Sequence, residues 1–405
     1  MAEIKPPVET FARIKVVGVG GSGSNAVNRM IDAKVKGVEF VAINTDAQDL
    51  HHNKSAEKVH IGKNLTKGLG AGMNPDIGRQ AAEENRDEIQ EVLKGTDMVF
   101  VTCGLGGGTG SGASAIVAET AKELGALTVA VVTKPFAFEG AQRRAIAEEA
   151  LENLKERVDT LITIPNDKLL QIIDKKTTLI NSFRIVDDVL RQGVQGISDL
   201  ITKPGIVNVD FADVKAIMSN SGSALMGIGI GSGENRAAEA ARAAINSPLL
   251  ELSIDGAKGV LFNVSGSTDL TMLEINEAAN IITESIDPNA RVIFGAVVDE
   301  AMKKGEVQIT VVATGFDADR VNENPIEKMS RITIEESRKR EREKEADNDN
   351  EDISITFPNK MEPRMIIEEK VPPKPQRLIA PKVKNLPDDD DELEIPAFIR
   401  RKMGK

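Results

Sequence analysis

Two glycine-rich segments contain the residues best suited to chemistry. The first, residues 18–25 (GVGGSGSN), follows an apolar run and leads into a helical pattern. Gly18, Gly20 and Gly23 have the spacing G-x-G-x-x-G, which is typical of dinucleotide-binding turns. Glycines let a backbone approach a ligand closely, and the N-terminus of a helix offers free N–H groups and a positive dipole end. A tight strand-to-helix turn is the alternative interpretation of this segment.

The second segment is harder to explain as a turn. Residues 104–112 (GLGGGTGSG) contain six glycines in nine positions, where a turn needs one or two. Backbone N–H groups wrapped around phosphates, assisted by the hydroxyls of Thr109 and Ser111, would explain this composition. Because both segments follow strands of one expected parallel sheet, they predict a single ligand crevice at the carboxyl ends of those strands. The chain has no G-x-x-x-x-G-K-[ST] motif, which excludes a P-loop NTPase.

The elements that must position these loops alternate between strand and helix patterns. Strands are expected at residues 13–19, 39–44, 97–103, 127–133 and 161–164, and helices at 24–34, 74–93, 111–124 and 141–158. Apolar strands separated by helices predict an α/β fold with a Rossmann-like parallel sheet that is covered on both faces.

A long helix and a second unit follow. Apolar residues spaced 3, 4, 4, 3 and 4 apart predict the helix, and they are Phe183, Val186, Leu190, Val194, Ile197 and Ile201. Further strands are expected near 224–229, 259–264, 291–298 and 307–313, with helices near 235–245 and 270–285. These patterns predict a second α/β domain.

The composition changes sharply near Phe316. Of the 34 glycines, 33 precede it, and residues 317–405 contain 41 charged residues in 89. Such a segment buries too little apolar surface to offset its chain entropy. We therefore expect a flexible N-terminus (1–11), a nucleotide-binding domain (12–181), a central helix (182–203), a C-terminal domain (204–316), a disordered linker (317–388) and a C-terminal peptide (389–405).

Charge and rare residues limit the classes of function. The net charge of −12 and the absence of Trp and Tyr disfavour nucleic-acid binding. The single cysteine, Cys103, excludes an intrachain disulfide, and we expect it to be a buried core residue. His51, His52 and His60 lie in a polar segment and are expected to be surface imidazoles. We expect no signal peptide, no transmembrane helix and a cytoplasmic location, because the chain has neither a signal-peptide core at its start nor an apolar run of 18 residues.

The motifs together resemble the tubulin/FtsZ family of GTPases. The resemblance covers about residues 12–316 and the last dozen residues. It rests on VVGVGGSGSNAVNRM (16–30), NTDAQ (44–48), TKGLGAGMNP (66–75), GLGGGTGSGA (104–113), VVTKPFAFEG (131–140), TIPNDKLL (163–170), NVDFADV (208–214) and ELEIPAFIRRK (392–402). Ser22 and Ser24 stand where the family usually has Gly or Asn, and Ser111 stands where Thr is usual. Serine keeps the small size, so we expect nucleotide binding to survive.

The resemblance implies a set of GTP- or GDP-binding residues. The two glycine segments would contact the phosphates through Gly21, Ser22, Gly23, Ser24, Gly107, Gly108, Thr109 and Gly110. Glu139 and Arg143 would hold the ribose and phosphate side. The guanine would lie among Asn25, Asn166, Phe183 and Asp187. A carboxylate can accept both guanine N1–H and N2–H₂, and a phenyl ring offers a stacking face. Phe183 could instead belong to the core stripe of the long helix, and Asp187 could be an exposed helix charge.

The segment 208–214 has two interpretations. From the residues alone, Asp210 caps a helix and Asp213 is a favourable acid in its first turn. The resemblance implies instead that Asn208, Asp210 and Asp213 enter the nucleotide pocket of the next subunit and orient the attacking water. Mg²⁺, held mainly by the nucleotide phosphates rather than by a protein metal site, would neutralise charge. Such a head-to-tail contact is heterologous and builds filaments.

The resemblance also implies a cellular role. It predicts a GTP-dependent homopolymer that forms the bacterial division ring at midcell. Residues 392–402 would bind division proteins and membrane tethers, without direct membrane insertion. Two other classes stay open: a nucleotide-cofactor oxidoreductase that uses the turn at 18–23 with Asp46 on the ribose, and a polymer or regulator that binds nucleotide without hydrolysing it.

Overall fold

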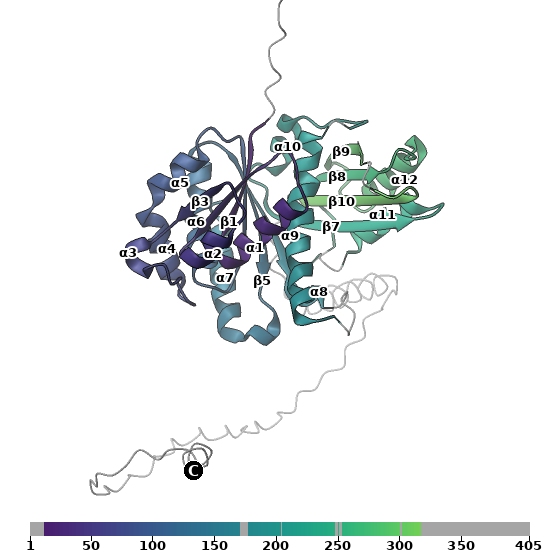
Figure 1. The fold of residues 1–405 in the computed structure, drawn as a ribbon. Coiled ribbons are helices and arrows are strands. Elements are labelled where there is room, and N and C mark those ends of the chain that lie inside the picture. The colour runs from purple at the N-terminus through teal and green to yellow at the C-terminus, as the bar shows by residue number, and fades with distance from the viewer. Residues whose placement is uncertain are drawn as a thin grey trace, which may run out of the picture. The chain divides into compact units, whose positions relative to one another are not determined.

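The structure is a computed structural model that describes residues 12–170, 177–203, 205–247, 250, 253–299 and 302–316 (Figure 1). The expected N-terminal segment 1–11, the linker 317–388 and the peptide 389–405 lie outside the described residues.

Six parallel strands form the N-terminal half of the sheet. They are β1 (Ile14–Val19), β2 (Glu39–Asn44), β3 (Glu57–His60), β4 (Met98–Gly104), β5 (Leu127–Lys134) and β6 (Thr160–Pro165), in the order β3-β2-β1-β4-β5-β6. This confirms the predicted Rossmann-like parallel sheet. The strands β1 and β4 are buried along almost their whole length because helices cover both faces.

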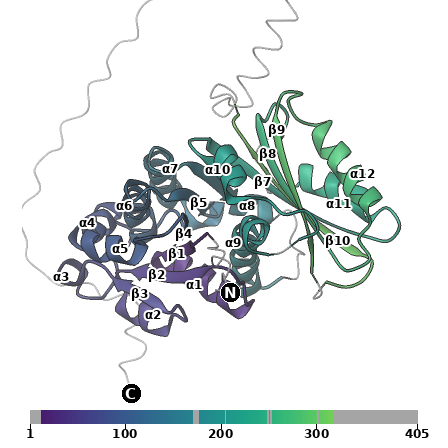
Figure 2. The same ribbon diagram turned by 90° about the horizontal axis from the view of Figure 1, so that it is seen from above.

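Nine helical segments accompany these strands. They are α1 (Gly20–Asp32), α2 (Ala47–His52), α3 (Lys63–Thr66), α4 (Pro75–Glu84), α5 (Arg86–Leu93), α6 (Thr109–Glu123), η1 (Ala137–Glu139), α7 (Ala141–Lys155) and α8 (Asn166–Leu169). Met30 of α1 packs with Val16 of β1 on one face, and Val117 of α6 packs with Val17 on the other. Figure 2 shows α1 on one side of the strands and α4, α6 and α7 on the other.

Several boundaries differ from those predicted. The helix expected at 74–93 is two helices, interrupted at Asn85, whose side chain accepts a hydrogen bond from the Gly62 N–H at 2.8 Å and donates to Glu88. The helices after the two glycine segments begin earlier than expected, at Gly20 and Thr109, so several of these glycines lie in first helical turns. Strand β3 and the short helices α2, α3, η1 and α8 were not predicted because they are too brief to show a period.

The long helix α9 (Leu179–Thr202) begins three residues earlier than expected, because Thr178 caps it through the Asn181 N–H. Four of its six stripe residues are buried, but Phe183 is exposed and Ile201 is only partly buried. The stripe therefore faces the core from Val186 to Ile197.

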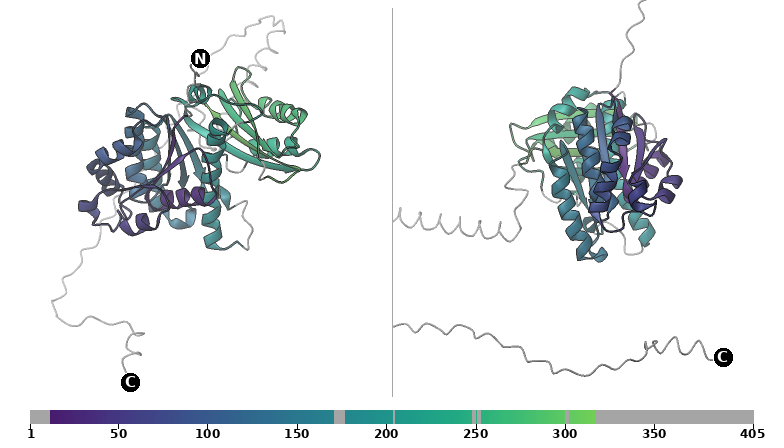
Figure 3. Two further views of the ribbon diagram at one scale, coloured as in Figure 1. Left: turned by 45° about the horizontal axis from the view of Figure 1, so that its top comes forward. Right: turned by 90° about the vertical axis from the view of Figure 1, so that its left-hand side faces the viewer.

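The C-terminal part continues the same sheet. It contains α10 (Phe211–Met218), β7 (Gly222–Ser232), α11 (Arg236–Ile245), β8 (Gly259–Gly266), α12 (Met272–Thr283), β9 (Arg291–Val298) and β10 (Glu306–Thr314). Strand β7 pairs with β6 in parallel over three residue pairs, so one sheet has the order β3-β2-β1-β4-β5-β6-β7-β10-β8-β9. Two domains joined only by a helix were expected, whereas this pairing also joins them. The domain boundaries stay a prediction. Figure 3 shows the green C-terminal strands beside the blue and purple N-terminal half.

A row of glycines lets α11 lie directly on β7. A Cβ atom at Gly227, Gly229 or Gly231 would lie 2.0, 2.0 or 1.9 Å from the carbonyl oxygen of Ala244, Ala240 or Arg236, respectively. The glycines recur with the two-residue period of one strand face, and small residues on α11 complete the contact. This glycine-rich stretch therefore serves packing and not ligand binding.

We expect Gly229→Ala to lower the free energy of unfolding by about 2–3 kcal/mol, because the added methyl group overlaps backbone that cannot move independently. Urea denaturation measures this loss. Ile230→Ala, at the 62% exposed neighbouring position, is the matched control and should cost less than about 1 kcal/mol. Equal losses in the two variants would show that the close approach is not the cause.

Candidate functional site

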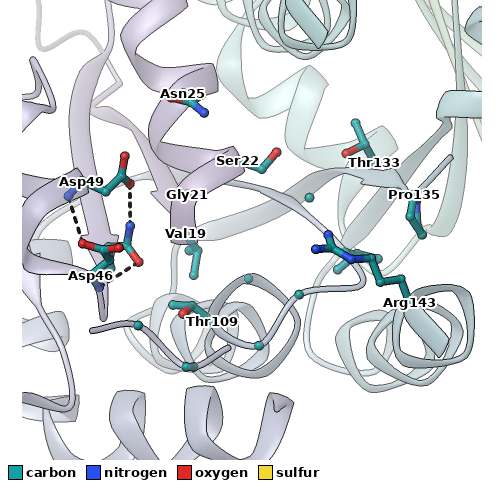
Figure 4. Close-up of a pocket in the computed structure, with 18 of the residues that line it drawn as sticks. Val19, Gly21, Ser22, Asn25, Asp46, Asp49, Thr109, Thr133, Pro135 and Arg143 are labelled. Carbon is teal, nitrogen blue, oxygen red and sulfur yellow. Dashed lines mark hydrogen bonds between the residues drawn. The ribbon is translucent and has the colours of Figure 1, made fainter. Parts of the chain in front are cut away.

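A cavity of about 630 Å³ opens at the carboxyl ends of β1, β4 and β5 (Figure 4). Val19 and Gly104 end β1 and β4, and Thr133 lies near the end of β5. This is the position that the order of the parallel strands predicts for a ligand.

Most of the predicted binding residues meet here. Twelve of them line the cavity: Gly21, Ser22, Asn25, Gly107, Gly108, Thr109, Gly110, Glu139, Arg143, Asn166, Phe183 and Asp187. Two others do not. Gly23 and Ser24 are buried, and a Cβ atom at Gly23 would lie 2.5 Å from the Thr102 carbonyl oxygen. Both residues belong to the packing of α1 against its neighbours and not to the cavity wall.

Two helices open toward the cavity without a side-chain cap. Val19 precedes α1 and Gly108 precedes α6, and neither position supplies a capping hydrogen bond from its side chain. Asp46 caps α2 and Asn74 caps α4, whereas α3, α5, α7, α8 and α11 also lack a side-chain cap, so α1 and α6 are distinguished by their glycine-rich starts beside the cavity. Each uncapped terminus leaves free N–H groups and a partial positive charge of the helix dipole beside the cavity. The arrangement favours an anion such as phosphate.

Residues of the second glycine segment differ in whether they contact the protein or face the cavity. The Gly106 N–H donates to Ser111 Oγ at 2.9 Å, so Ser111 braces the loop and does not line this cavity, contrary to its predicted role on phosphate. The Gly108 N–H donates to the Gly72 carbonyl oxygen at 2.9 Å, and a Cβ atom there would lie 2.6 Å from the same oxygen. A Cβ atom at Gly107 would meet no atom within 4 Å. Gly107 is therefore the glycine that faces open space.

The loop between α3 and α4 was missed as part of the site. Leu69, Gly70, Ala71 and Gly72 line the cavity, and the Leu69 side chain is 85% exposed. Gly68, Gly70 and Gly72, together with Lys67, have positive φ angles. The motif at 66–75 contributed to the resemblance, and its alternate glycines were the available signal for a loop of this kind.

A second group lies on the side of α2, and sequence reasoning missed its members Asn44 and Asp49. Asn44 Nδ2 donates to Asp49 Oδ2 at 2.6 Å. The Asp49 N–H donates to Asp46 Oδ1 at 3.1 Å, and both aspartates are labelled in Figure 4. All three residues line the cavity. Burial raises the pKa of Asp49 above its ordinary value, although the hydrogen bond from Asn44 opposes the rise. Asp46 is occupied in capping α2, which weakens its alternative assignment to a ribose.

Glu139 and Arg143 form one unit at the cavity edge. Glu139 accepts hydrogen bonds from the Phe136 N–H and from Arg143 Nη1, each at 3.0 Å. The short η1 turn and the first turn of α7 bring them together. Figure 4 shows the Arg143 side chain extending from its helix toward the cavity.

Phe183 near the start of α9 and Asn166 at the start of α8 both line the cavity. Phe183 is 42% exposed and meets Phe136 edge to face, with ring centroids 5.6 Å apart. Its face is therefore accessible, and the alternative that it belongs to the core stripe is not supported. Asn166 is buried, and its Oδ1 has no hydrogen-bond partner within the described part of the chain. An unpaired buried acceptor is costly, so this atom favours a ligand that donates a hydrogen bond.

The pKa values of two adjacent aspartates on α9, Asp187 and Asp188, are shifted in opposite directions. Burial raises the pKa of Asp187 to about 6, Arg29 opposes this and Asp188 adds to it. For Asp188, burial is outweighed by hydrogen bonds from Arg191 and Gln192, and its pKa lies below the ordinary value. Asp187 lines the cavity and Asp188 does not. Asp187 is thus a carboxylate that lacks the strong partners of its neighbour.

Asn208, Asp210 and Asp213 lie away from this cavity. Asp210 caps α10 by accepting from the Ala212 N–H, and Asn208 Oδ1 accepts from the Gly205 N–H at 2.7 Å. Asp210 lines a different depression together with Ala12, Arg13, Gly95 and Asp97, which precede β1 and β4. Asp210 therefore lies toward the amino ends of the parallel strands, with Asn208 and Asp213 close to it in the chain, and the glycine segments lie at the carboxyl ends.

Other sequence expectations are resolved by burial. Cys103 is fully buried, and burial raises the pKa of its thiol to about 12, which confirms a core residue. His51 and His52 are exposed, whereas His60 is half-buried with Nε2 3.3 Å from the Thr45 carbonyl oxygen. None of the described helices has the length and apolarity needed to span a membrane.

Comparison with known proteins agrees with this geometry. The family model for the GTPase domain of the tubulin/FtsZ family matches residues 13–174, and the model for the C-terminal domain of the FtsZ family matches residues 222–317. A solved FtsZ dimer from M. jannaschii is 50% identical, covers 76% of this chain and 89% of its own, and superposes with a TM-score of 0.73. CetZ1 from Haloferax volcanii, solved as a GDP-bound monomer, is 21% identical over 80% of this chain and 99% of its own, with a TM-score of 0.67, and shows the shared fold.

The family models together span both halves of the sheet, and the FtsZ match is far above the identity at which only a fold is shared. With the glycine segments gathered on one cavity, these findings establish that the chain belongs to the tubulin/FtsZ family, on its FtsZ side, and is a GTPase.

Proposed function

We propose that this GTPase assembles head to tail and that each subunit completes the hydrolytic site of its neighbour. One observation carries the proposal: the glycine cavity and the residues Asn208, Asp210 and Asp213 lie toward opposite ends of the parallel strands. A chain built this way cannot bring its own loop to its own nucleotide. The related FtsZ from M. jannaschii, which was solved as a dimer, supports self-association.

The cavity fits a guanine nucleotide in one orientation. The free N–H groups at the starts of α1 and α6 suit the phosphates, and the open space at Gly107 admits them. Glu139 and Arg143 then lie on the ribose and phosphate side. Phe183 offers a stacking face, while Asp187 and Asn166 offer acceptors to the N–H groups of guanine. Adenine lacks the N1–H and N2–H₂ donors, so this end of the cavity selects guanine.

Hydrolysis then needs a water that is held in line with the terminal phosphate. In the proposed assembly, Asp213 of one subunit, exposed in the first turn of α10, accepts a hydrogen bond from this water at the neighbour's cavity. Asp210 and Asn208 hold the loop in shape through their bonds to the Ala212 and Gly205 N–H groups. Mg²⁺, bound mainly through phosphate oxygens, would supply charge neutralisation.

The cellular role follows from the family and remains part of the proposal. Filaments of this kind would form the bacterial division ring in the cytoplasm at midcell. Residues 392–402 would bind division proteins and membrane tethers, with Ile395, Phe398 and Ile399 as apolar anchors. The net charge of −12 continues to disfavour nucleic acid as a partner.

The shared site is testable by mixing two inactive variants. Asp213→Asn keeps an intact cavity, and Gly107→Asp keeps an intact loop but places a carboxylate where phosphate should lie. Each variant alone should lose GTPase activity by a factor of about 100 or more. Their mixture should recover activity, because the cavity of one subunit meets the loop of the other. Phosphate release measures the recovery.

The matched control is a mixture of Asp213→Asn with Asp213→Ala, in which every loop lacks the Asp213 carboxylate and no recovery is expected. If the first mixture releases phosphate no faster than its components measured separately, each subunit works alone and the shared site is wrong.

The phosphate contact predicts a specific effect of Gly107→Ala. The added methyl group meets no protein atom, so the free energy of unfolding without nucleotide should stay within about 0.5 kcal/mol of the original. GTP affinity should nevertheless fall by a factor of ten or more, about 1.4 kcal/mol, because the methyl group occupies phosphate space. Gly108→Ala, whose methyl group strikes the 71–74 backbone, should lower both quantities. Unchanged GTP affinity in Gly107→Ala would exclude a phosphate at this position.

The role of Asp187 predicts a pH dependence of nucleotide binding. Guanine N–H groups need the ionised carboxylate, whereas the free protein binds a proton there with a pKa of about 6. Proton and nucleotide therefore compete, and GTP affinity should fall by roughly a factor of ten between about pH 7.5 and pH 5. Asp187→Asn should bind weakly at both pH values, and Asp188→Asn should keep the pH dependence. Titration with a fluorescent GTP analogue measures these affinities.

A higher pH should strengthen GTP binding through Asp187, but in the nucleotide-free protein it should lower the stability of the fold. Folding raises the pKa of Asp187 from 3.8 to about 6, so its contribution to stability falls as the pH rises between these two values, and the full loss is present above about pH 6. Asp187→Asn should therefore raise the melting temperature near about pH 8 but not near about pH 4. A lower melting temperature at both pH values would show that Asp187 has a stabilising partner instead.

A further inference from the structure

We propose that Thr45 is a positioning residue whose hydroxyl orients the hydroxyl of Thr109 toward a phosphate of the bound nucleotide. This inference rests on the proposed placement of phosphates at the start of α6. Thr109 is the first residue of α6 and lines the cavity, where Figure 4 shows it beside Val19. Thr45 does not line the cavity, but its Oγ lies 2.6 Å from Thr109 Oγ.

The hydroxyl pair allows only one arrangement of protons when phosphate is present. A hydroxyl has one proton to donate, and ionised phosphate oxygens accept hydrogen bonds. If Thr109 donates to phosphate, its contact with Thr45 persists only when Thr45 is the donor. Thr45 therefore donates to Thr109, and Thr109 donates to the ligand. Without phosphate either hydroxyl can be the donor, so the nucleotide selects one direction of the chain.

The surroundings of Thr45 keep its hydroxyl in place. Thr45 is fully buried directly after β2, and its carbonyl oxygen accepts a hydrogen bond from Thr66 Oγ at 3.2 Å. Thr66 ends α3, at the start of the loop whose residues 69–72 line the cavity. The Ala47 N–H also donates to the Gly68 carbonyl oxygen at 3.1 Å. Thr45 thus joins three cavity segments: the end of β2, the 66–72 loop and the start of α6.

A buried threonine on β4 provides a control. Thr102 of β4 is fully buried, and its Oγ1 has no hydrogen-bond partner among the residues that the structure describes. Thr102 does not line the cavity. Valine has nearly the shape of threonine, so Thr102→Val and Thr45→Val remove equivalent hydroxyls from equally buried sites. They differ in whether the lost hydroxyl has a partner in the cavity wall.

The experiment measures equilibrium binding of GTP, GDP and guanosine to the full chain. Thr45→Val should bind GTP and GDP about five- to tenfold more weakly, because one hydroxyl–hydroxyl bond is lost and Thr109 loses its orientation. Its affinity for guanosine, which has no phosphate, should not change. Thr45→Ser should restore the nucleotide affinities, and Thr102→Val should match the unsubstituted protein for all three ligands. Should Thr45→Val not fold, Thr45→Ala removes the same hydroxyl without adding volume and is judged by the same criteria.

A double-mutant cycle tests whether Thr45 acts through Thr109. In a Thr109→Val background, adding Thr45→Val should cause no further loss of GTP affinity. A full additional loss, an unchanged affinity in Thr45→Val, or a Thr45→Ser variant as weak as Thr45→Val would each overturn the inference. An unsubstituted protein that binds guanosine as tightly as GDP would contradict the proposed phosphate site itself, and this inference with it.

Discussion

The site depends on one electrostatic constraint: two helix N-termini without side-chain caps meet at the carboxyl ends of β1 and β4. The unpaired N–H groups there are costly unless a ligand or water accepts from them. Glycine is required where these helices approach other backbone, as the 2.9 Å distance from a Cβ atom at Gly20 to the Gly110 nitrogen shows. An anion between the two termini satisfies the donors and offsets the two aligned dipoles. The loop at 69–72 and the glycine segment at 104–110 line the cavity around that position.

The common direction of the parallel strands sets which way the cavity and the acidic loop face. Parallel strands have chemically different ends, so a cavity at the carboxyl ends and an acidic loop toward the amino ends necessarily face opposite ways. In the proposed assembly, the cavity of one subunit meets the acidic loop of the next, which is an open head-to-tail contact instead of a closed pair. The pairing of β6 with β7 and the packing of the long helix α9 into the same core hold the cavity and the 208–214 loop in one body.

Some residues that line the cavity reduce the stability of the free protein. Asp187 carries a raised pKa because it is buried without the donors that Asp188 has, and Asn166 keeps a buried acceptor without a partner among the described residues. Such groups destabilise a free protein and become satisfied by a ligand with matching donors. By contrast, Ser111 and Gly23, which sequence reasoning placed on the ligand, have contacts within the protein: Ser111 Oγ accepts from the Gly106 N–H, and Gly23 packs closely on the Thr102 carbonyl oxygen.

The residues by themselves predicted the fold class and the location of both glycine segments, because hydrophobic period and glycine spacing are local properties. The twelve predicted residues that line the cavity came from the motifs shared with the tubulin/FtsZ family. The sequence could not predict which residues of 106–111 face the cavity and which contact the protein, since that depends on whether a neighbouring backbone occupies the space beside each glycine. The contributions of Thr45 and the loop 69–72 were likewise hidden, because they arise from contacts between segments far apart in the chain. Only the tertiary structure decided that Asp210 and Asp213 lie away from the chain's own cavity, because the separation of the two sites is set by strand direction and sheet order, which no local pattern records.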